Sequence, residues 1–469
     1  MQATTDPTFY RTAADAAAAP AEELAYVAAF DPTGATPDAM LVVGVNPAST
    51  DFGKVVGSLE VGEPGDELHH FGWNACSSAY KHEGHDMSGL ARRYLVVPGL
   101  RSSNIYVMDT KPDPRKPTLH KTIPAKELAA KAGYSRPHTV HCGPKGIFMT
   151  CLGTGDGSLG GPGGIALLDH DTFDVIGAWE QDRGPQHFHY DAWWHLNSNV
   201  LISSEWGTPD MFENGLVPEK LLANEYGHSI HFWDLAGGKH LQQVDLGAHN
   251  QLAFELRPAH DPDATWGFVG VVVSTQDLSA SIFRWFKDGD EWKAEKVISI
   301  PAQPADPDLL PPLLKGFGAV PPLVSDIDLS VDDQMLYVSC WGTGELKQYD
   351  VSDPANPREV GSVSLGGIVN RTAHPALPGT PLSGGPQMVE VSRDGRRVYF
   401  TNSLYGAIDG QFYPDGVGSW MAMANVGPNG GLHLDEKFFL HGEKDFGGRR
   451  VHQVRLQGGD ASSDSYCYR

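Results

Sequence analysis

The sequence feature that most constrains the fold is a short strand-like run that recurs seven times, at intervals of roughly 50 to 75 residues. The seven runs occupy residues 41–45, 105–109, 165–169, 230–234, 282–286, 346–350 and 420–423. Most are followed by a polar turn and a second β-rich run. Several are preceded by a hairpin in which Asp-Asp or Asp-Gly separates two alternating runs, as in residues 325–339 and 388–401. The repeated unit therefore predicts four antiparallel strands.

Such a unit predicts an all-β fold, a seven-bladed β-propeller with four-stranded antiparallel blades, because radial stacking covers the faces that an isolated sheet leaves exposed. The 54 glycines and 34 prolines agree with many turns and short strands. The start of the chain supplies only the last two strands of a unit, and residues 450–456 and 464–468 resemble the missing first two. We expect these N- and C-terminal strands to share one blade and close the ring. Residues 1–30 are assigned to an N-terminal extension and residues 31–469 to a single propeller domain.

Two long loops interrupt the repeat, at residues 301–322 and 374–385, and both are rich in proline. One interpretation is that a propeller face simply tolerates insertions. The other is a lid over the central channel, since long loops in compact folds are often functional. The sequence leaves both interpretations open.

The formal net charge of -23 argues against nucleic acid or an anionic membrane as a partner, because both are polyanions. No secretory signal and no apolar run of membrane-spanning length is evident in the sequence. The five cysteines are an odd number without CxxC spacing, which indicates reduced thiols rather than a disulfide framework. We therefore expect a cytoplasmic protein, and the composition leaves a homo-oligomer open.

The candidate chemistry centres on residues 69–78, His-His-Phe-Gly-Trp-Asn-Ala-Cys-Ser-Ser. Imidazoles beside a thiol are typical of a metal or redox site, although a buried aromatic turn with one satisfied histidine would also explain them. The first strand of each propeller blade lines the central channel, and further histidines precede the repeated hairpins. The candidate metal ligands are His69, His70, His138, His141 and His452.

Imidazoles that converge from several blades suit copper, iron or zinc. Neighbours on a regular strand point to opposite faces, so His69 and His70 can bind one ion only where the backbone is bent. For His138 and His141 we expect one ligand and one structural histidine. A calcium-dependent hydrolase of the lactonase kind would instead need oxygen ligands at the axis.

Ten segments of the chain, taken together, resemble the selenium-binding protein family, which includes the methanethiol oxidases. They run in the same order from about residue 22 to the C-terminus and include residues 66–78, 103–107, 138–142, 204–206, 346–354, 384–388 and 403–405. The resemblance implies a copper-dependent oxidase. Its substrates would be methanethiol, a small volatile thiol, together with O2 and water, and its products formaldehyde, hydrogen sulfide and hydrogen peroxide.

The resemblance also assigns roles to individual residues. It places the paired histidines on His69 and His70, a His-x-x-His-Cys motif on residues 138–142, the near-terminal histidine on His452, and the reactive, selenium-linked thiol on Cys76. Many members have Cys-Ser-Ser-Cys where this chain has Ala79 as the fourth residue, which places a two-thiol selenium site in doubt.

Three residues are candidates for direct catalysis: Cys76, and Glu255 and Asp326 as bases near the axis. Cys76 could be a redox partner, a ligand or a bystander. The alternative function is a non-catalytic selenium-binding or thiol-redox sensor protein that uses Cys76.

Overall fold

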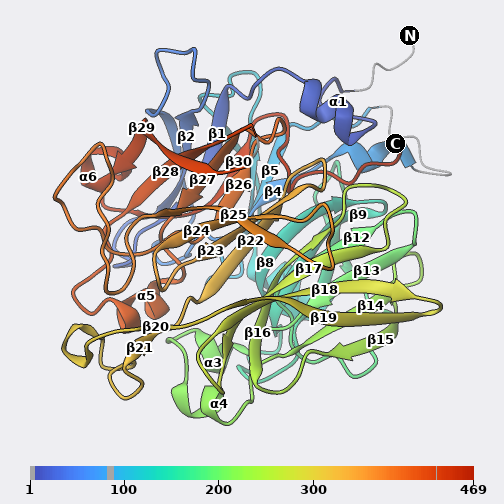
Figure 1. Ribbon diagram of the computed structural model, residues 1–469. Coiled ribbons are helices and arrows are strands. Elements are labelled where there is room, and N and C mark those ends of the chain that lie inside the picture. Colours follow the sequence, from blue (N-terminus) through green and yellow to red (C-terminus); the bar gives the residue numbers. More distant parts are fainter. Residues whose placement is uncertain (1–5, 82–88, 429) are drawn as a thin grey trace.

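The computed structural model describes residues 6–81, 89–428 and 430–469. These residues form seven four-stranded antiparallel sheets, arranged around the centre of the molecule, and one two-stranded sheet (Figure 1). The predicted seven-bladed β-propeller is confirmed. Across the described ranges, no helix is long and apolar enough to cross a membrane.

The strands fall into four concentric sets. The innermost strands are β30 (Arg450–Leu456), β4 (Gly72–Trp73), β8 (Tyr134–Gly143), β12 (Ala192–His195), β16 (Asn250–Pro258), β22 (Val324–Leu329) and β26 (Val389–Val391). The second strands are β1 (Leu24–Phe30), β5 (Tyr94–Pro98), β9 (Gly146–Thr154), β13 (Val200–Ser204), β17 (Trp266–Ser274), β23 (Met335–Cys340) and β27 (Arg397–Thr401).

The two outer sets complete each blade. The third strands are β2 (Asp38–Gly44), β6 (Ile105–Asp109), β10 (Gly164–Leu168), β14 (Ser229–Asp234), β18 (Ala280–Asp288), β24 (Glu345–Asp350) and β28 (Trp420–Val426). The outermost strands are β3 (Val55–Val61), β7 (Thr118–Ile123), β11 (Val175–Ala178), β15 (Lys239–Asp245), β19 (Glu291–Ile300), β25 (Arg358–Ser364) and β29 (Leu432–His441). Each copy of the repeated run coincides with a third strand.

Ring closure follows the prediction in outline but not in detail. Both chain ends share one blade, whose strand order is β3-β2-β1-β30, so three strands come from the N-terminus and one from the C-terminus. The propeller therefore begins with β1, before the predicted boundary at residue 31, and residues 464–468 form no strand. All seven residues of β1 are buried, and a strand that is covered on both faces lacks the alternation by which strands are recognised.

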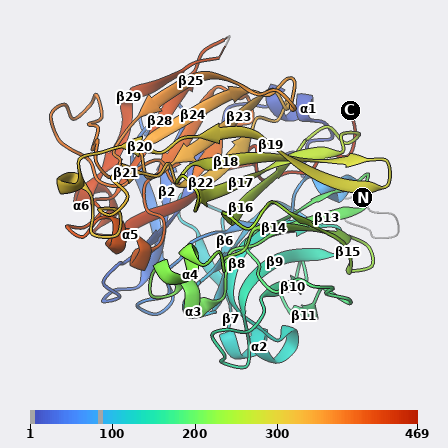
Figure 2. The ribbon, with the colours of Figure 1, turned by 60° about the horizontal axis from the view of Figure 1, so that its bottom comes forward.

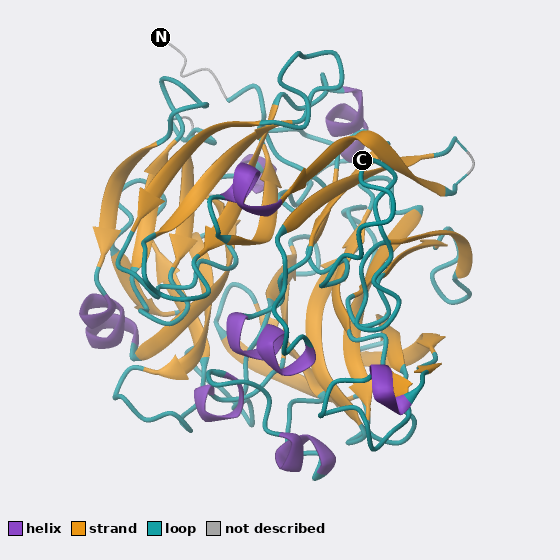
Figure 3. Cartoon of the chain, turned by 90° about the vertical axis from the view of Figure 1, so that its left-hand side faces the viewer, coloured by secondary structure: helices purple, strands orange, loops and turns teal. Residues whose placement is uncertain are grey.

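The helices are short and lie at the edges of the sheets (Figure 3): α1 (Ala13–Ala18), α2 (Ala125–Ala132), α3 (Pro209–Phe212), α4 (Pro218–Leu222), α5 (Gly406–Phe412), α6 (Gly442–Phe446), and the 3-10 helices η1 (Ser77–Lys81) and η2 (Pro307–Leu309). The loop at residues 301–322 is closed at its base by the pairing of β20 (Gln303–Pro304) with β21 (Ala319–Val320). This loop lies at the same end of the molecule as α3, α4 and α5 (Figure 2).

Candidate metal centre

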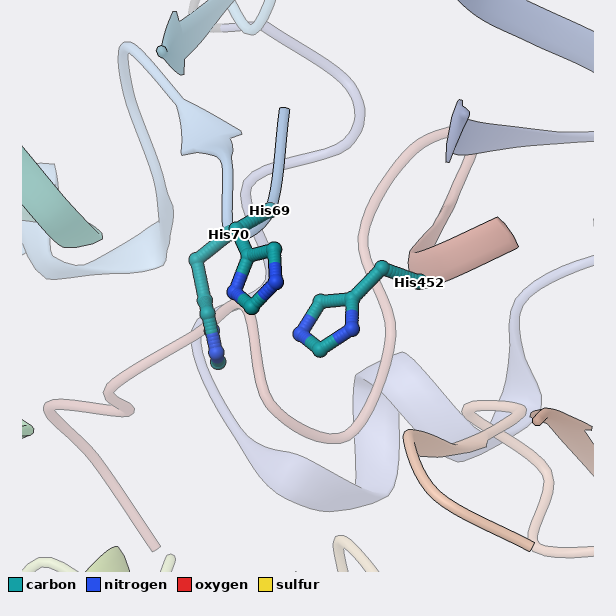
Figure 4. A group of neighbouring side chains, drawn as sticks. All are labelled: His69, His70 and His452. Carbon is teal, nitrogen blue, oxygen red and sulfur yellow. The ribbon is translucent and has the colours of Figure 1, made fainter. Parts of the chain in front are cut away.

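Three of the five predicted histidines converge (Figure 4). His69, His70 and His452 are buried, and one ring nitrogen from each lies within 4.8 Å of the others. The rings of His69 and His452 are stacked, with their centroids 3.7 Å apart. This three-histidine cluster joins the chain before β4 to the closing strand β30, so ring closure creates it.

Local backbone irregularities allow the three side chains to meet. His69 and His70 precede β4 outside regular strand structure, two residues after Glu67 with its φ of 55°. The bend required for both rings to reach one point is therefore present. The pairing of β30 with β1 shifts register beside His452, and a bulge of this kind redirects side chains.

Hydrogen bonds leave ring nitrogens available for a metal. The Nδ1 of His452 lies 2.7 Å from the carbonyl oxygen of Ser403, which can only accept, so Nδ1 carries the proton and Nε2 keeps its lone pair. Within the described residues, the Nε2 atoms of His69, His70 and His452 have no hydrogen-bond partner. Buried polar atoms are seldom left unpaired, so this donor set fits a bound transition metal.

Burial also sets the protonation state of the cluster. It lowers the pKa of His69 and His70 well below the usual value and lowers the pKa of His452 to about 3. The imidazoles are therefore neutral at neutral pH, which is the form that binds metal ions.

The other two predicted histidines lie on β8 and have different surroundings. The ring centroid of His138 is 4.1 Å from that of His70, but His138 does not belong to the three-histidine cluster. The Nε2 of His141 lies 3.5 Å from Oδ1 of Asp191, and its ring packs on Trp193. His141 therefore lies outside the cluster, while His138 lies beside it.

A small chamber opens beside the cluster; we call it the inner chamber. Its volume is about 30 Å³, and it is lined by His69, His138 and His452, by Ser325 and Gln387, and by a mainly aromatic and aliphatic wall that includes Tyr190, Trp206, Phe254 and Tyr405. Sequence reasoning assigned no role to these aromatic residues, although Trp206 and Tyr405 lie in segments that carry the family resemblance. A volume of this size holds one or two water-sized groups, which matches a molecule of two heavy atoms.

Of the two predicted bases, Glu255 lies nearer the cluster. Its Oε1 is 3.8 Å from Nε2 of His70, and its Oε2 accepts a hydrogen bond from Arg257. Burial and the neighbouring carboxyl groups of Asp191 and Asp326 raise the pKa of Glu255 well above the usual value. Asp326 instead accepts hydrogen bonds from Arg257 and from the backbone N–H of Val389, and burial raises its pKa to about 7. Asp326 is part of a buried ion network and does not line the inner chamber.

The structure overturns the expectation of reduced thiols for two of the five cysteines. Cys76 and Cys142 form a disulfide bond that joins the segment after β4 to β8. The two cysteines are 66 residues apart, so no local sequence pattern indicates that they pair. The packing of two adjacent blades brings them together. Cys76 is also absent from the lining of the inner chamber. The cytoplasmic location stays a prediction, without the support of the cysteine pattern.

We expect the peptides that carry Cys76 and Cys142 to stay linked when the protein is denatured and digested without reductant. Dithiothreitol should separate them, and mass spectrometry of the alkylated digest measures this directly. Recovery of both peptides singly alkylated before reduction would contradict the bridge. The Cys142→Ser variant is the control, because its Cys76 peptide should be recovered unlinked.

The fold and this site define a β-propeller protein with a buried histidine cluster among its innermost strands. Residues 3–467 match the family described as 56kDa selenium binding protein (SBP56), and the chain belongs to this family. It is 40% identical to a methanethiol oxidase of Xenopus tropicalis and 38% identical to selenium-binding protein 2 of Mus musculus, in each case over 97% of both chains. The X-ray structure of a hypothetical selenium-binding protein from Sulfolobus tokodaii superposes with a TM-score of 0.94, at 52% identity, over 99% of this chain and 100% of that one.

Proposed function

We propose that this protein is a copper-dependent methanethiol oxidase that converts methanethiol, O2 and water to formaldehyde, hydrogen sulfide and hydrogen peroxide. The observation that carries the proposal is the cluster of three neutral, buried imidazoles beside an apolar chamber sized for two heavy atoms. The names of the relatives support the same activity. Copper held by His69, His70 and His452 would supply a soft binding site for the thiolate and a route for electrons to O2.

The protein itself supplies orientation and a dry site. The hydrogen bond from His452 to Ser403 holds the imidazole in the tautomer that presents Nε2 to the cluster. The aromatic walls exclude water from the chamber, which strengthens electrostatic interactions inside it. Glu255 lies 3.8 Å from Nε2 of His70 but does not line the chamber, so it is a neighbour of the cluster rather than a group in contact with the substrate.

The test is aerobic turnover by protein purified with copper available. We expect His69→Ala to lower the rate of sulfide and peroxide release by about 100-fold or more, because it removes a metal ligand. His141→Ala should stay within about tenfold of the unmodified protein, since its ring lies outside the cluster. Equal losses in the two variants would contradict the assignment of the cluster as the active site.

A selenium-binding or thiol-redox role is the second candidate, and the family description and the name of the mouse relative support it. Cys76 is bonded to Cys142, so this role would require the disulfide to be reduced first. The Cys76→Ala and Cys142→Ala variants both lose the bridge, but only the second keeps the Cys76 thiol. For the oxidase we expect both variants to retain copper and turnover. If selenium binding or thiol-redox activity were lost in Cys76→Ala alone, and no sample contained copper, the second candidate would be established instead.

A further inference from the structure

A second cavity adjoins the inner chamber, between α4 and the loop at residues 301–322; we call it the outer chamber. Its volume is about 190 Å³. In the part of the chain that the structure describes, Thr275 is the one polar residue of its lining, and the remainder are leucine, valine, phenylalanine and proline. Such a cavity favours apolar ligands, because a water molecule there would find few hydrogen-bond partners.

The two chambers are separated by one layer of side chains, which we call the partition. Leu216, Leu252, Leu323 and Phe412 line both cavities. The backbone at Leu252 and Leu323 has φ values of 68° and 52°, which are uncommon for leucine. Two unfavourable backbone conformations in the partition indicate that the fold holds Leu252 and Leu323 in place at a local cost in conformational free energy.

The outer chamber extends from this partition to the surface. Leu222 and Phe317, at its rim, are 58% and 47% exposed, whereas Leu252 and Leu323 are buried. The loop at residues 301–322 supplies Leu313, Leu314, Phe317 and Pro321 to one wall, and the β20–β21 pairing holds the base of this loop. The loop therefore covers an approach to the cluster.

We propose that the outer chamber binds the alkyl group of short, uncharged alkanethiols on their way to the histidine cluster, and that the partition sets the chain length that reaches it. The inner chamber has room for methanethiol, whereas the outer chamber has room for several more carbon atoms. Each methylene group transferred from water strengthens binding about fourfold. The identity of the substrate class rests on the proposed oxidase function, but binding in the outer chamber does not.

The first test uses xenon and 1-butanethiol as probes of the copper-free full-length protein, so that no turnover is needed. Crystals under xenon pressure should show xenon in the outer chamber. The Leu313→Trp variant should lose this site and bind 1-butanethiol at least about tenfold more weakly by calorimetry, because the indole fills the cavity. Leu309→Trp is the matched control, since Leu309 lies on the same loop, is 63% exposed and does not line the chamber. An empty outer chamber in the unmodified protein, or equal affinity in Leu313→Trp, would overturn the inference.

The second test uses the copper-loaded enzyme. Leu323→Ala opens the partition, so we expect the ratio of kcat/KM for 1-propanethiol to that for methanethiol to rise about tenfold or more. An unchanged ratio in a folded variant would refute the role of the partition. Binding of xenon and butanethiol without any thiol turnover would refute the oxidase function but not ligand binding in the outer chamber. Turnover without such binding would refute the role of the outer chamber but not the oxidase function.

Discussion

The His452→Ala variant should fail to bind the copper that we propose for the three-histidine cluster, and it should turn over methanethiol at least about 100-fold more slowly than the unmodified protein. Substitution of a residue that merely supports a metal ligand already costs 10- to 100-fold, and this one would remove a proposed ligand itself. The Nε2 of His452 faces the cluster, and its Nδ1 is committed to Ser403, so no other atom of the side chain could serve. Elemental analysis and the aerobic thiol assay on one preparation measure both effects.

His433→Ala is the matched control for this variant, because His433 lies on the outermost strand β29 and is exposed. It should retain copper and full activity. A folded His452→Ala protein that still binds one equivalent of copper and oxidises methanethiol would show that the cluster is not the active site. Circular dichroism establishes that the comparison is between folded proteins.

The second large effect is expected on stability. Arg257 lies at the centre of a buried ion network. Its guanidinium nitrogens lie 3.1 to 3.7 Å from carboxylate oxygens of four residues: Glu255, Asp326, Asp328 and Asp191. Arg257→Met should lower the free energy of unfolding by about 3 to 5 kcal/mol, because it leaves buried carboxyl groups without a counter-charge. Urea denaturation followed by tryptophan fluorescence measures the loss. Arg284→Met is the control, with an expected loss of about 1 kcal/mol or less, since Arg284 pairs with the half-exposed Glu295.

The loss in Arg257→Met should depend on pH. Burial already raises the pKa values of Glu255, Asp326 and Asp328, and without the guanidinium they rise further in the folded state, while those in the unfolded chain stay near 4. The folded variant then binds more protons than the unfolded chain, so its stability falls as the pH rises through this interval. We expect a larger deficit at pH 8 than at pH 5. A deficit that is equal at both pH values would show that lost packing, rather than unpaired charge, is its cause.

Prediction from the sequence succeeded where the signal is local. Turn residues and apolar runs identified the third strands and their hairpins, and the repeat then implied the ring. The strand β1 was not predicted, because it is buried on both faces. The shared blade was therefore predicted with two strands from each end of the chain instead of three and one. The two-residue strand β4 is too short to show any period.

The sequence by itself determined the architecture and nominated the histidines, because strand periodicity, turn chemistry and the choice of imidazole side chains are properties of neighbouring residues. Only the tertiary structure decided which of the histidines meet. His70 contacts Gln453 across 383 residues of sequence, and Cys76 reaches Cys142 from the adjacent blade. These contacts depend on the packing of neighbouring blades, and for His70 and Gln453 on closure of the ring. Local register shifts in β30 and β8 add to them, and these features bring together side chains that no pattern along the chain relates.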